Sequence, residues 1–137
     1  MKGFEKIIYK DKEIAMVFRG NMELEGIKFF TDEMNPFQIG IHNRPKGVKL
    51  NPHIHKMAHA LVIKTIQEVL FVQRGKIRVN LFTKAGEKIQ SVVLVKGDSI
   101  LLMGEAHGVD ILEDSYIFEI KQGPYPGTEH AKIYLKT

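Results

Sequence analysis

The sequence predicts an all-β fold, a sandwich or a barrel, on three observations. Strand-sized segments rich in Val, Ile and Phe recur along residues 68–122. Gly or Asp turns separate these segments, which is typical of all-β domains with short connections. The chain has 137 residues and no cysteine, and this length favours one domain whose core folds without disulfides.

Most of the expected strands lie in the second half of the chain. They span residues 68–73, 76–83, 88–95, 99–103, 108–114 and 116–122. Residues 76–83 alternate apolar and polar side chains with a period of two, which indicates a strand buried on one face. In the first third, we expect a hairpin over residues 6–18, turning around Lys10–Lys12, and strands over residues 26–31 and 37–42.

Two segments are less regular. Residues 56–67 fit either a helical turn, with His55 and His59 on one face, or a loop that leads into a strand. Four β-branched residues between positions 62 and 66 favour the extended alternative. Two prolines and two glycines in Gly123–Gly127 end regular pairing, and we expect a short strand over residues 132–136 beyond them.

Composition excludes several classes of function. The net charge is +4, but the lysines are spread along the chain and alternate with acids, without a basic run of five or more. We therefore expect no nucleic-acid partner. No run of about 18 apolar residues is present, so we expect no membrane span. The N-terminus has no apolar signal segment, and the absence of cysteine is compatible with a cytoplasmic location, which we expect.

A pair of histidines suggests a metal site. His53 and His55 follow Pro52 and lie two residues apart, so in an extended chain both side chains point to the same face. Two imidazoles on one face can occupy neighbouring positions on one metal ion. Parity also places Glu68, with Leu70 and Val72, on one face of its strand.

The same parity argument applies to the strand that follows residue 107. It places His107 on one face with two apolar residues, Val109 and Ile111. Each of the two strands thus combines one candidate ligand with apolar neighbours, as the interior of a barrel requires. Burial of imidazoles and a carboxylate costs several kcal/mol without compensation, and a divalent cation offsets that cost.

The spacing of these residues resembles a known family. The pattern Gly47-x5-His53-x-His55, followed by Glu68-x6-Gly75 and then Gly97-x6-Gly104-x2-His107, resembles the two signature motifs of the cupin superfamily. The resemblance covers residues 36–122 and implies a double-stranded β-helix, or jelly-roll barrel. It also implies a divalent metal ion (Zn, Fe, Mn, Ni or Cu) bound in the barrel by His53, His55, Glu68 and His107.

The chain departs from the family pattern in two places. Twelve residues separate His55 from Glu68 where the family has three or four, which leaves Glu68 as either a ligand or an acid at the barrel mouth. Leu102 stands where the family has a proline, and this motif is one residue longer.

The expected organisation is a single cupin domain over residues 1–137. Residues 1–35 add edge strands, residues 36–122 form the barrel and residues 123–137 form an extension. Because exposed barrel edges are commonly hidden by dimerisation, we expect a homodimer.

The functional expectation is a metal-dependent enzyme acting on a small polar molecule that resembles a sugar or a hydroxy-acid. An isomerase or epimerase, a lyase and a dioxygenase all stay open, as do a non-catalytic binding or sensing module and a metal-free structural barrel. Candidates for proton transfer are His42, His59 and Tyr125. We expect His130 to face solvent and five large apolar residues to pack in the core: Phe29, Phe30, Met57, Met103 and Phe118.

Overall fold

The computed structural model describes all residues except 58, 59, 61 and 137. The chain divides into two compact units, each of which is described by itself. The larger unit comprises Met1–Met22 and Thr65–Thr137, and the smaller unit comprises Glu23–Lys64. Almost all regular structure in the described residues is β-strand, which confirms the all-β prediction.

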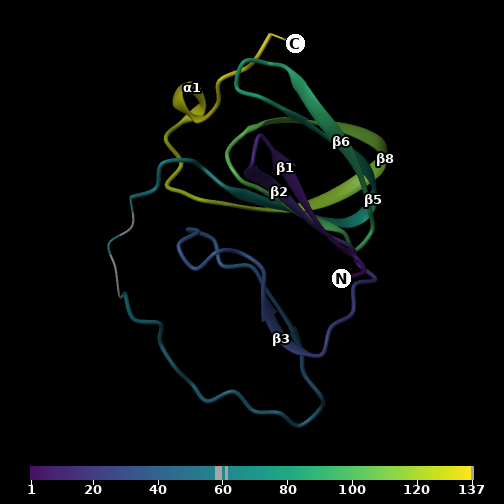
Figure 1. Ribbon diagram of the computed structural model, residues 1–137, viewed down its shortest axis with the longest axis vertical. Coiled ribbons are helices and arrows are strands. Elements are labelled where there is room, and N and C mark those ends of the chain that lie inside the picture. Colours follow the sequence, from purple (N-terminus) through teal and green to yellow (C-terminus); the bar gives the residue numbers. More distant parts are fainter. Residues whose placement is uncertain (58–59, 61, 137) are drawn as a thin grey trace. The chain divides into compact units, whose positions relative to one another are not determined.

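The larger unit is built on one curled antiparallel sheet (Figure 1). Its strands are β1 (Phe4–Tyr9), β2 (Lys12–Phe18), β5 (Glu68–Phe82), β6 (Lys88–Val95), β7 (Ser99–Leu102) and β8 (Ala106–Lys121). The strand order is β1-β2-β7-β5-β6, and β8 pairs with β5. The smaller unit contains the antiparallel pair β3 (Gly26–Phe29) and β4 (Gly40–Asn43). A short helix, α1 (Thr128–Ala131), follows β8.

Strand β5 organises the larger sheet. Along one side, β7 pairs with the first part of β5 and β6 pairs with its second part, while β8 runs along the other side. The break between β6 and β7 is bridged by backbone hydrogen bonds from Gly97 N–H to the Val72 carbonyl and from Val72 N–H to the Asp98 carbonyl. The expected hairpin of β1 and β2 joins this sheet through β2 and β7.

Two expected turns are bulges inside longer strands. Residues 68–73 and 76–83 were expected as separate strands, but β5 continues through Gly75, and β8 likewise continues through Ser115. The register between β5 and β8 shifts around Arg74 and Lys76, and Gly75 has φ of 92°. A glycine with positive φ serves a bulge as well as a tight turn, so its presence alone does not distinguish the two.

The core lies on one face of the curled sheet. Leu70 and Val72 are buried on that face before the bulge, and Ile77, Val79 and Leu81 are buried after it. The change from even to odd numbers follows from the extra residue at the bulge. Glu68 is also buried, so the predicted shared face of Glu68, Leu70 and Val72 is confirmed.

The matching face of β8 is exposed. His107, Val109 and Ile111 pair with Leu81, Val79 and Ile77, so they lie on the core face as parity predicts. However, Val109 is 38% exposed and Ile111 is 58% exposed. Strand β8 pairs only with β5 among the described residues, and an edge strand buries less of each side chain. Val109 and Ile111 are therefore not buried as the interior of a closed barrel would require.

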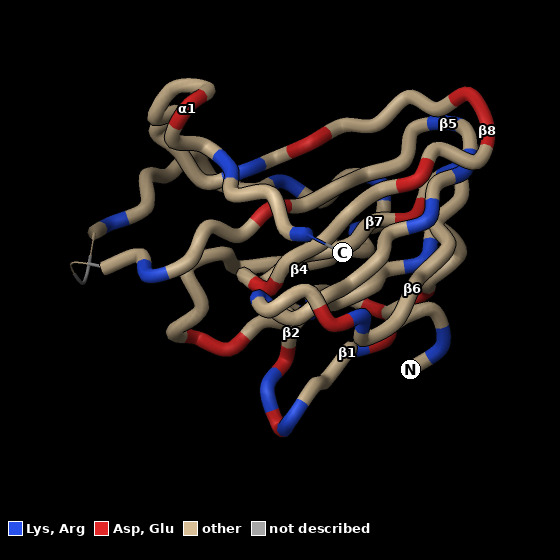
Figure 2. The backbone as a smooth tube through the Cα atoms, turned by 90° about the horizontal axis from the view of Figure 1, so that it is seen from above, with Lys and Arg blue, Asp and Glu red and all other residues tan. Residues whose placement is uncertain are grey.

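Of the remaining predictions about burial and secondary structure, some agree with the structure and others do not. Phe30 is buried and His130 is exposed, as expected, but Phe29, Met57 and Phe118 are exposed rather than packed in the core. The described residues of 56–67 contain neither helix nor strand, and the expected strand over residues 132–136 does not form. The charged residues divide unevenly among the strands: β5 carries three basic residues after Glu68, β6 carries only Lys88, and β8 carries four acidic residues before Lys121 (Figure 2). Within the described part of the chain, no helix has the length and apolar character needed to cross a membrane.

Candidate functional site

The curl of the sheet brings two predicted site residues into contact. Glu68 begins β5, whereas His107 pairs with Leu81, which lies 13 residues further along the same strand. A straight strand would separate these two places by roughly 40 Å. Instead, His107 Nε2 lies 2.6 Å from Glu68 Oε1. The β5–β8 ribbon therefore curls back until the beginning of β8 meets the beginning of β5.

The Glu68 carboxylate is held ionised in a partly buried place. Burial acts to raise its pKa, but hydrogen bonds from His107 and Glu119 and the positive charges of His107 and Lys121 outweigh burial, so the pKa of Glu68 lies below its ordinary value. The Glu68 side chain is 11% exposed and that of His107 is 31% exposed. The His107 ring thus reaches solvent, and a small molecule can approach it.

Glu119 completes this cluster and was missed in the sequence. It lies on β8 opposite Leu70 and forms a hydrogen bond with Glu68. That hydrogen bond, burial and the negative charge of Glu68 raise the pKa of Glu119, and Lys121 and Lys132 partly offset the rise. The available signal was parity, because Ile117, Glu119 and Lys121 alternate along β8 and Ile117 packs against the core.

The other predicted ligands lie in the smaller unit. The rings of His53 and His55 lie 5.0 Å apart between centroids, at an angle of 65° between their planes. His53 Nδ1 lies 2.8 Å from the Asn51 carbonyl oxygen, a contact that orients the ring. The two units are each described by themselves, so the four-residue ligand set stays a prediction.

Two of the three candidates for proton transfer contact other residues, and the third lies outside the described residues. In the smaller unit, His42 packs edge-on against Phe29, with ring centroids 6.1 Å apart. The Tyr125 hydroxyl lies 2.9 Å from the Thr128 hydroxyl, and the Tyr125 side chain is exposed. His59 lies outside the described residues. Over the part of the chain that is described, three or more His, Asp or Glu side chains nowhere form a group that could hold a metal ion.

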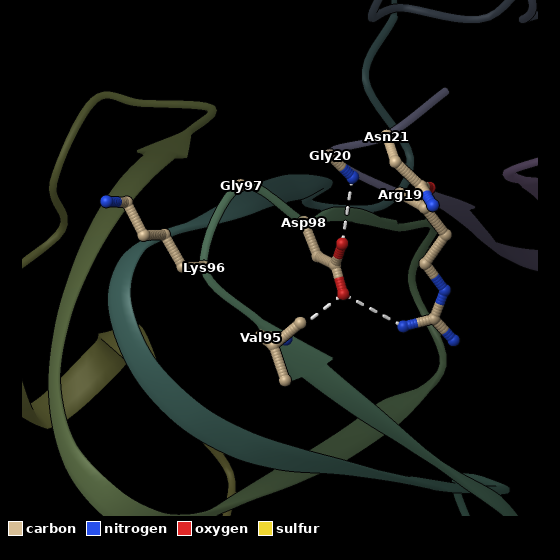
Figure 3. A pocket seen from close by; sticks show the side chains of 7 residues that line it. All are labelled: Arg19, Gly20, Asn21, Val95, Lys96, Gly97 and Asp98. Atoms are coloured by element: carbon tan, nitrogen blue, oxygen red, sulfur yellow. Dashed lines mark hydrogen bonds and ion pairs between the residues drawn. The ribbon is translucent and has the colours of Figure 1, made fainter. Parts of the chain in front are cut away.

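A second polar cluster lies where β2 ends beside the link between β6 and β7 (Figure 3). The Asp98 carboxylate is buried and accepts hydrogen bonds from Arg19 at 2.9 Å, from Gly20 N–H at 2.8 Å and from Val95 N–H at 3.0 Å. Arg19 also donates to the Val93 carbonyl at 2.7 Å. The cluster borders an open depression of about 580 Å³. Because the polar groups of this cluster form hydrogen bonds with one another, we interpret the cluster as a structural connection between the end of β2 and the link between β6 and β7.

Comparisons with protein-family models, with curated proteins and with solved structures found no match to this chain. The candidate site consequently depends on its own geometry and on the sequence pattern.

The lowered pKa of Glu68 predicts how stability depends on pH in the metal-free protein. The folded state holds Glu68 ionised below its ordinary pKa of 4.5, so its contribution to stability is complete above pH 4.5 and is lost as the pH falls through the folded pKa. We expect the stability difference between the wild type and Glu68→Gln to shrink from about pH 6 to about pH 3 in urea unfolding experiments.

The raised pKa of Glu119 acts in the opposite direction and must be controlled. Glu119→Gln keeps a hydrogen-bond donor toward Glu68 at every pH, so both proteins are compared in that background as well. A stability difference that grows as the pH falls would contradict the assignment.

Proposed function

We propose that this protein is a cupin-type barrel that binds a divalent metal ion and uses it to hold a small polar molecule. Glu68 and His107 are two of the ligands, and His53 and His55 are the further imidazole ligands that the sequence pattern predicts. The observation that supports the proposal best is the 2.6 Å contact between Glu68 and His107 at the two ends of a curled ribbon.

The donor atoms fit a metal ion with little movement. Ligand bonds of about 2.0–2.1 Å at right angles place two donor atoms about 2.9 Å apart. Glu68 Oε1 and His107 Nε2 need to separate by only a few tenths of an ångström from their present 2.6 Å. The ion would replace the proton that these two atoms share, and the ionised state of Glu68 favours that exchange.

The donor set defines the chemistry that such an ion would supply. Imidazole nitrogens and a carboxylate oxygen suit Zn, Fe, Mn, Ni or Cu. Three nitrogen ligands and one oxygen ligand leave two positions on an octahedral ion, which favour a bidentate molecule such as a hydroxy-acid or a diol. The bound ion would act as a Lewis acid toward that molecule. The residues of the chain would supply the ligands and orient them.

A non-catalytic binding or sensing module is the second candidate. It is favoured by the contacts of the described proton-transfer candidates, because the Tyr125 hydroxyl bonds Thr128 and the His42 ring packs on Phe29. The two candidates share the metal centre and differ in whether the bound molecule is changed, which mass analysis of the molecule after incubation distinguishes.

The metal content of protein purified without an affinity tag tests the proposal. We expect about one divalent ion per chain by elemental analysis, and a decrease in affinity of at least about 10-fold in His107→Ala and in Glu68→Gln, because loss of a ligand exceeds loss of a supporting hydrogen bond. His130→Ala is the matched control, since His130 is exposed on α1 and should retain the wild-type content. Unchanged metal content in both site variants would overturn the proposal.

A further inference from the structure

We propose that the molecule bound at the Glu68–His107 centre carries an anionic oxygen group, a carboxylate in a hydroxy-acid, and that Lys121 binds this group. The inference rests on the proposed function, since it names the substrate class of the same site. It adds a residue that the sequence pattern does not include.

Lys121 lies beside Glu68 on the neighbouring strand. It is the last residue of β8 and pairs directly with Glu68 across the antiparallel ladder. Side chains of directly opposed residues lie on the same face, with Cβ atoms about 4.5–5.5 Å apart. Lys121 therefore extends from the core face beside the Glu68 carboxylate, and it is exposed.

Lys121 has no close acidic partner among the ion pairs of the described residues, which have nitrogen–oxygen distances of at most 4.0 Å. Other lysines of the same unit do form such pairs, as Lys6 does with Glu13 at 2.5 Å and Lys12 with Glu105 at 3.3 Å. The ammonium group of Lys121 is thus near the carboxylates of the site, close enough to influence both, without being closed in an ion pair.

The charge of the whole cluster favours an anion. The positive charge of Lys121 acts on the carboxyl groups of both Glu68 and Glu119, and that of Lys132 acts on Glu119. Even when both carboxyl groups are ionised, the four formal charges only cancel, so a divalent ion bound at Glu68 and His107 would leave the cluster with an excess of positive charge. A neutral sugar would leave that excess uncompensated, whereas a carboxylate would bind the metal ion and Lys121 together.

Binding of matched small molecules to the metal-loaded protein tests the inference. Glycolate and glycolamide have the same hydroxyl group and nearly the same size, but only glycolate is charged. By isothermal titration calorimetry we expect glycolate to bind at least about 10-fold more tightly than glycolamide, because a charge-assisted contact replaces a neutral one. Inorganic phosphate is titrated in parallel to distinguish a phosphate site from a carboxylate site.

Two variants separate the role of Lys121 from a general effect of charge. Lys121→Met should weaken glycolate binding about 10-fold while the metal content stays at the wild-type value. Lys84→Met removes an exposed lysine from the turn between β5 and β6 and should leave glycolate binding unchanged. Melting temperatures of both variants verify that the fold is retained.

The outcomes distinguish this inference from the proposed function. Full metal content with equal binding of glycolate and glycolamide, or with unchanged glycolate binding in Lys121→Met, would overturn the inference and leave the metal site standing. Tighter binding of phosphate than of glycolate, lost in Lys121→Met, would support the lysine and overturn the carboxylate assignment. Absence of metal from the wild type would overturn the proposed function before any ligand is added.

Discussion

Gly75→Ala is expected to lower the free energy of unfolding by about 2 to 5 kcal/mol. Gly75 has φ of 92°, where a residue with a Cβ atom is disfavoured by about 1–2 kcal/mol. A Cβ atom at this position would also overlap the Asp114 carbonyl oxygen and the Ser115 hydroxyl, and it would lie 2.6 Å from Ser115 Cα. Two of these three atoms are backbone atoms of the paired strand, so relief requires β5 and β8 to separate, at a further cost of about 1–3 kcal/mol.

Gly127→Ala is the matched control for Gly75→Ala. Gly127 belongs to the same unit and has φ of 96°, but a Cβ atom there meets nothing within 4 Å. Its substitution should therefore show the backbone cost alone, about 1–2 kcal/mol. Urea unfolding followed by circular dichroism measures both variants. Equal losses of stability would show that the approach of β8 to Gly75 is not as close as the structure has it.

Asp98→Ala is expected to lower the free energy of unfolding by about 3 kcal/mol. The variant loses the acceptor of three hydrogen bonds, two of them from backbone N–H groups of Gly20 and Val95. It also leaves the Arg19 guanidinium without its carboxylate partner. The loss is placed at the lower end for a buried pair because the Arg19 side chain is 35% exposed, so water partly replaces the partner.

Asp110→Ala is the control for Asp98→Ala. Asp110 is an exposed acid on β8 that accepts one hydrogen bond, from Asn80 at 2.9 Å, so its loss should cost less than about 1 kcal/mol. Thermal or urea unfolding compares the two variants. If Asp98→Ala is no less stable than Asp110→Ala, the cluster with Arg19 does not join β2 to the β6–β7 link.

Local patterns were enough to predict where most of the strand segments lie and which faces of β5 are buried. Alternation along residues 76–83 and the parity of Glu68, Leu70 and Val72 agree with burial in the structure, because both depend only on the period of a strand. Local pattern could not tell the bulge at Gly75 from a turn, since the same positive φ serves both. It also gave no measure of burial for β8, which depends on what pairs with its outer side.

The candidate site could likewise be predicted only in part from the sequence. The sequence pattern selected Glu68 and His107, and their contact requires the long curl of the β5–β8 ribbon, which no local signal encodes. Glu119 and Lys121 were missed because a charged residue on a strand most often faces solvent. Only the register with β5 shows that these two side chains lie beside Glu68.

X-ray absorption spectroscopy of the metal-loaded protein tests the central claim most directly, because it reports the ligands of the ion itself. The account predicts a spectrum with three imidazole ligands and oxygen in the remaining positions, reduced by one imidazole in His107→Ala. A wild-type spectrum without imidazole scattering, or one that is identical in His107→Ala, would contradict it.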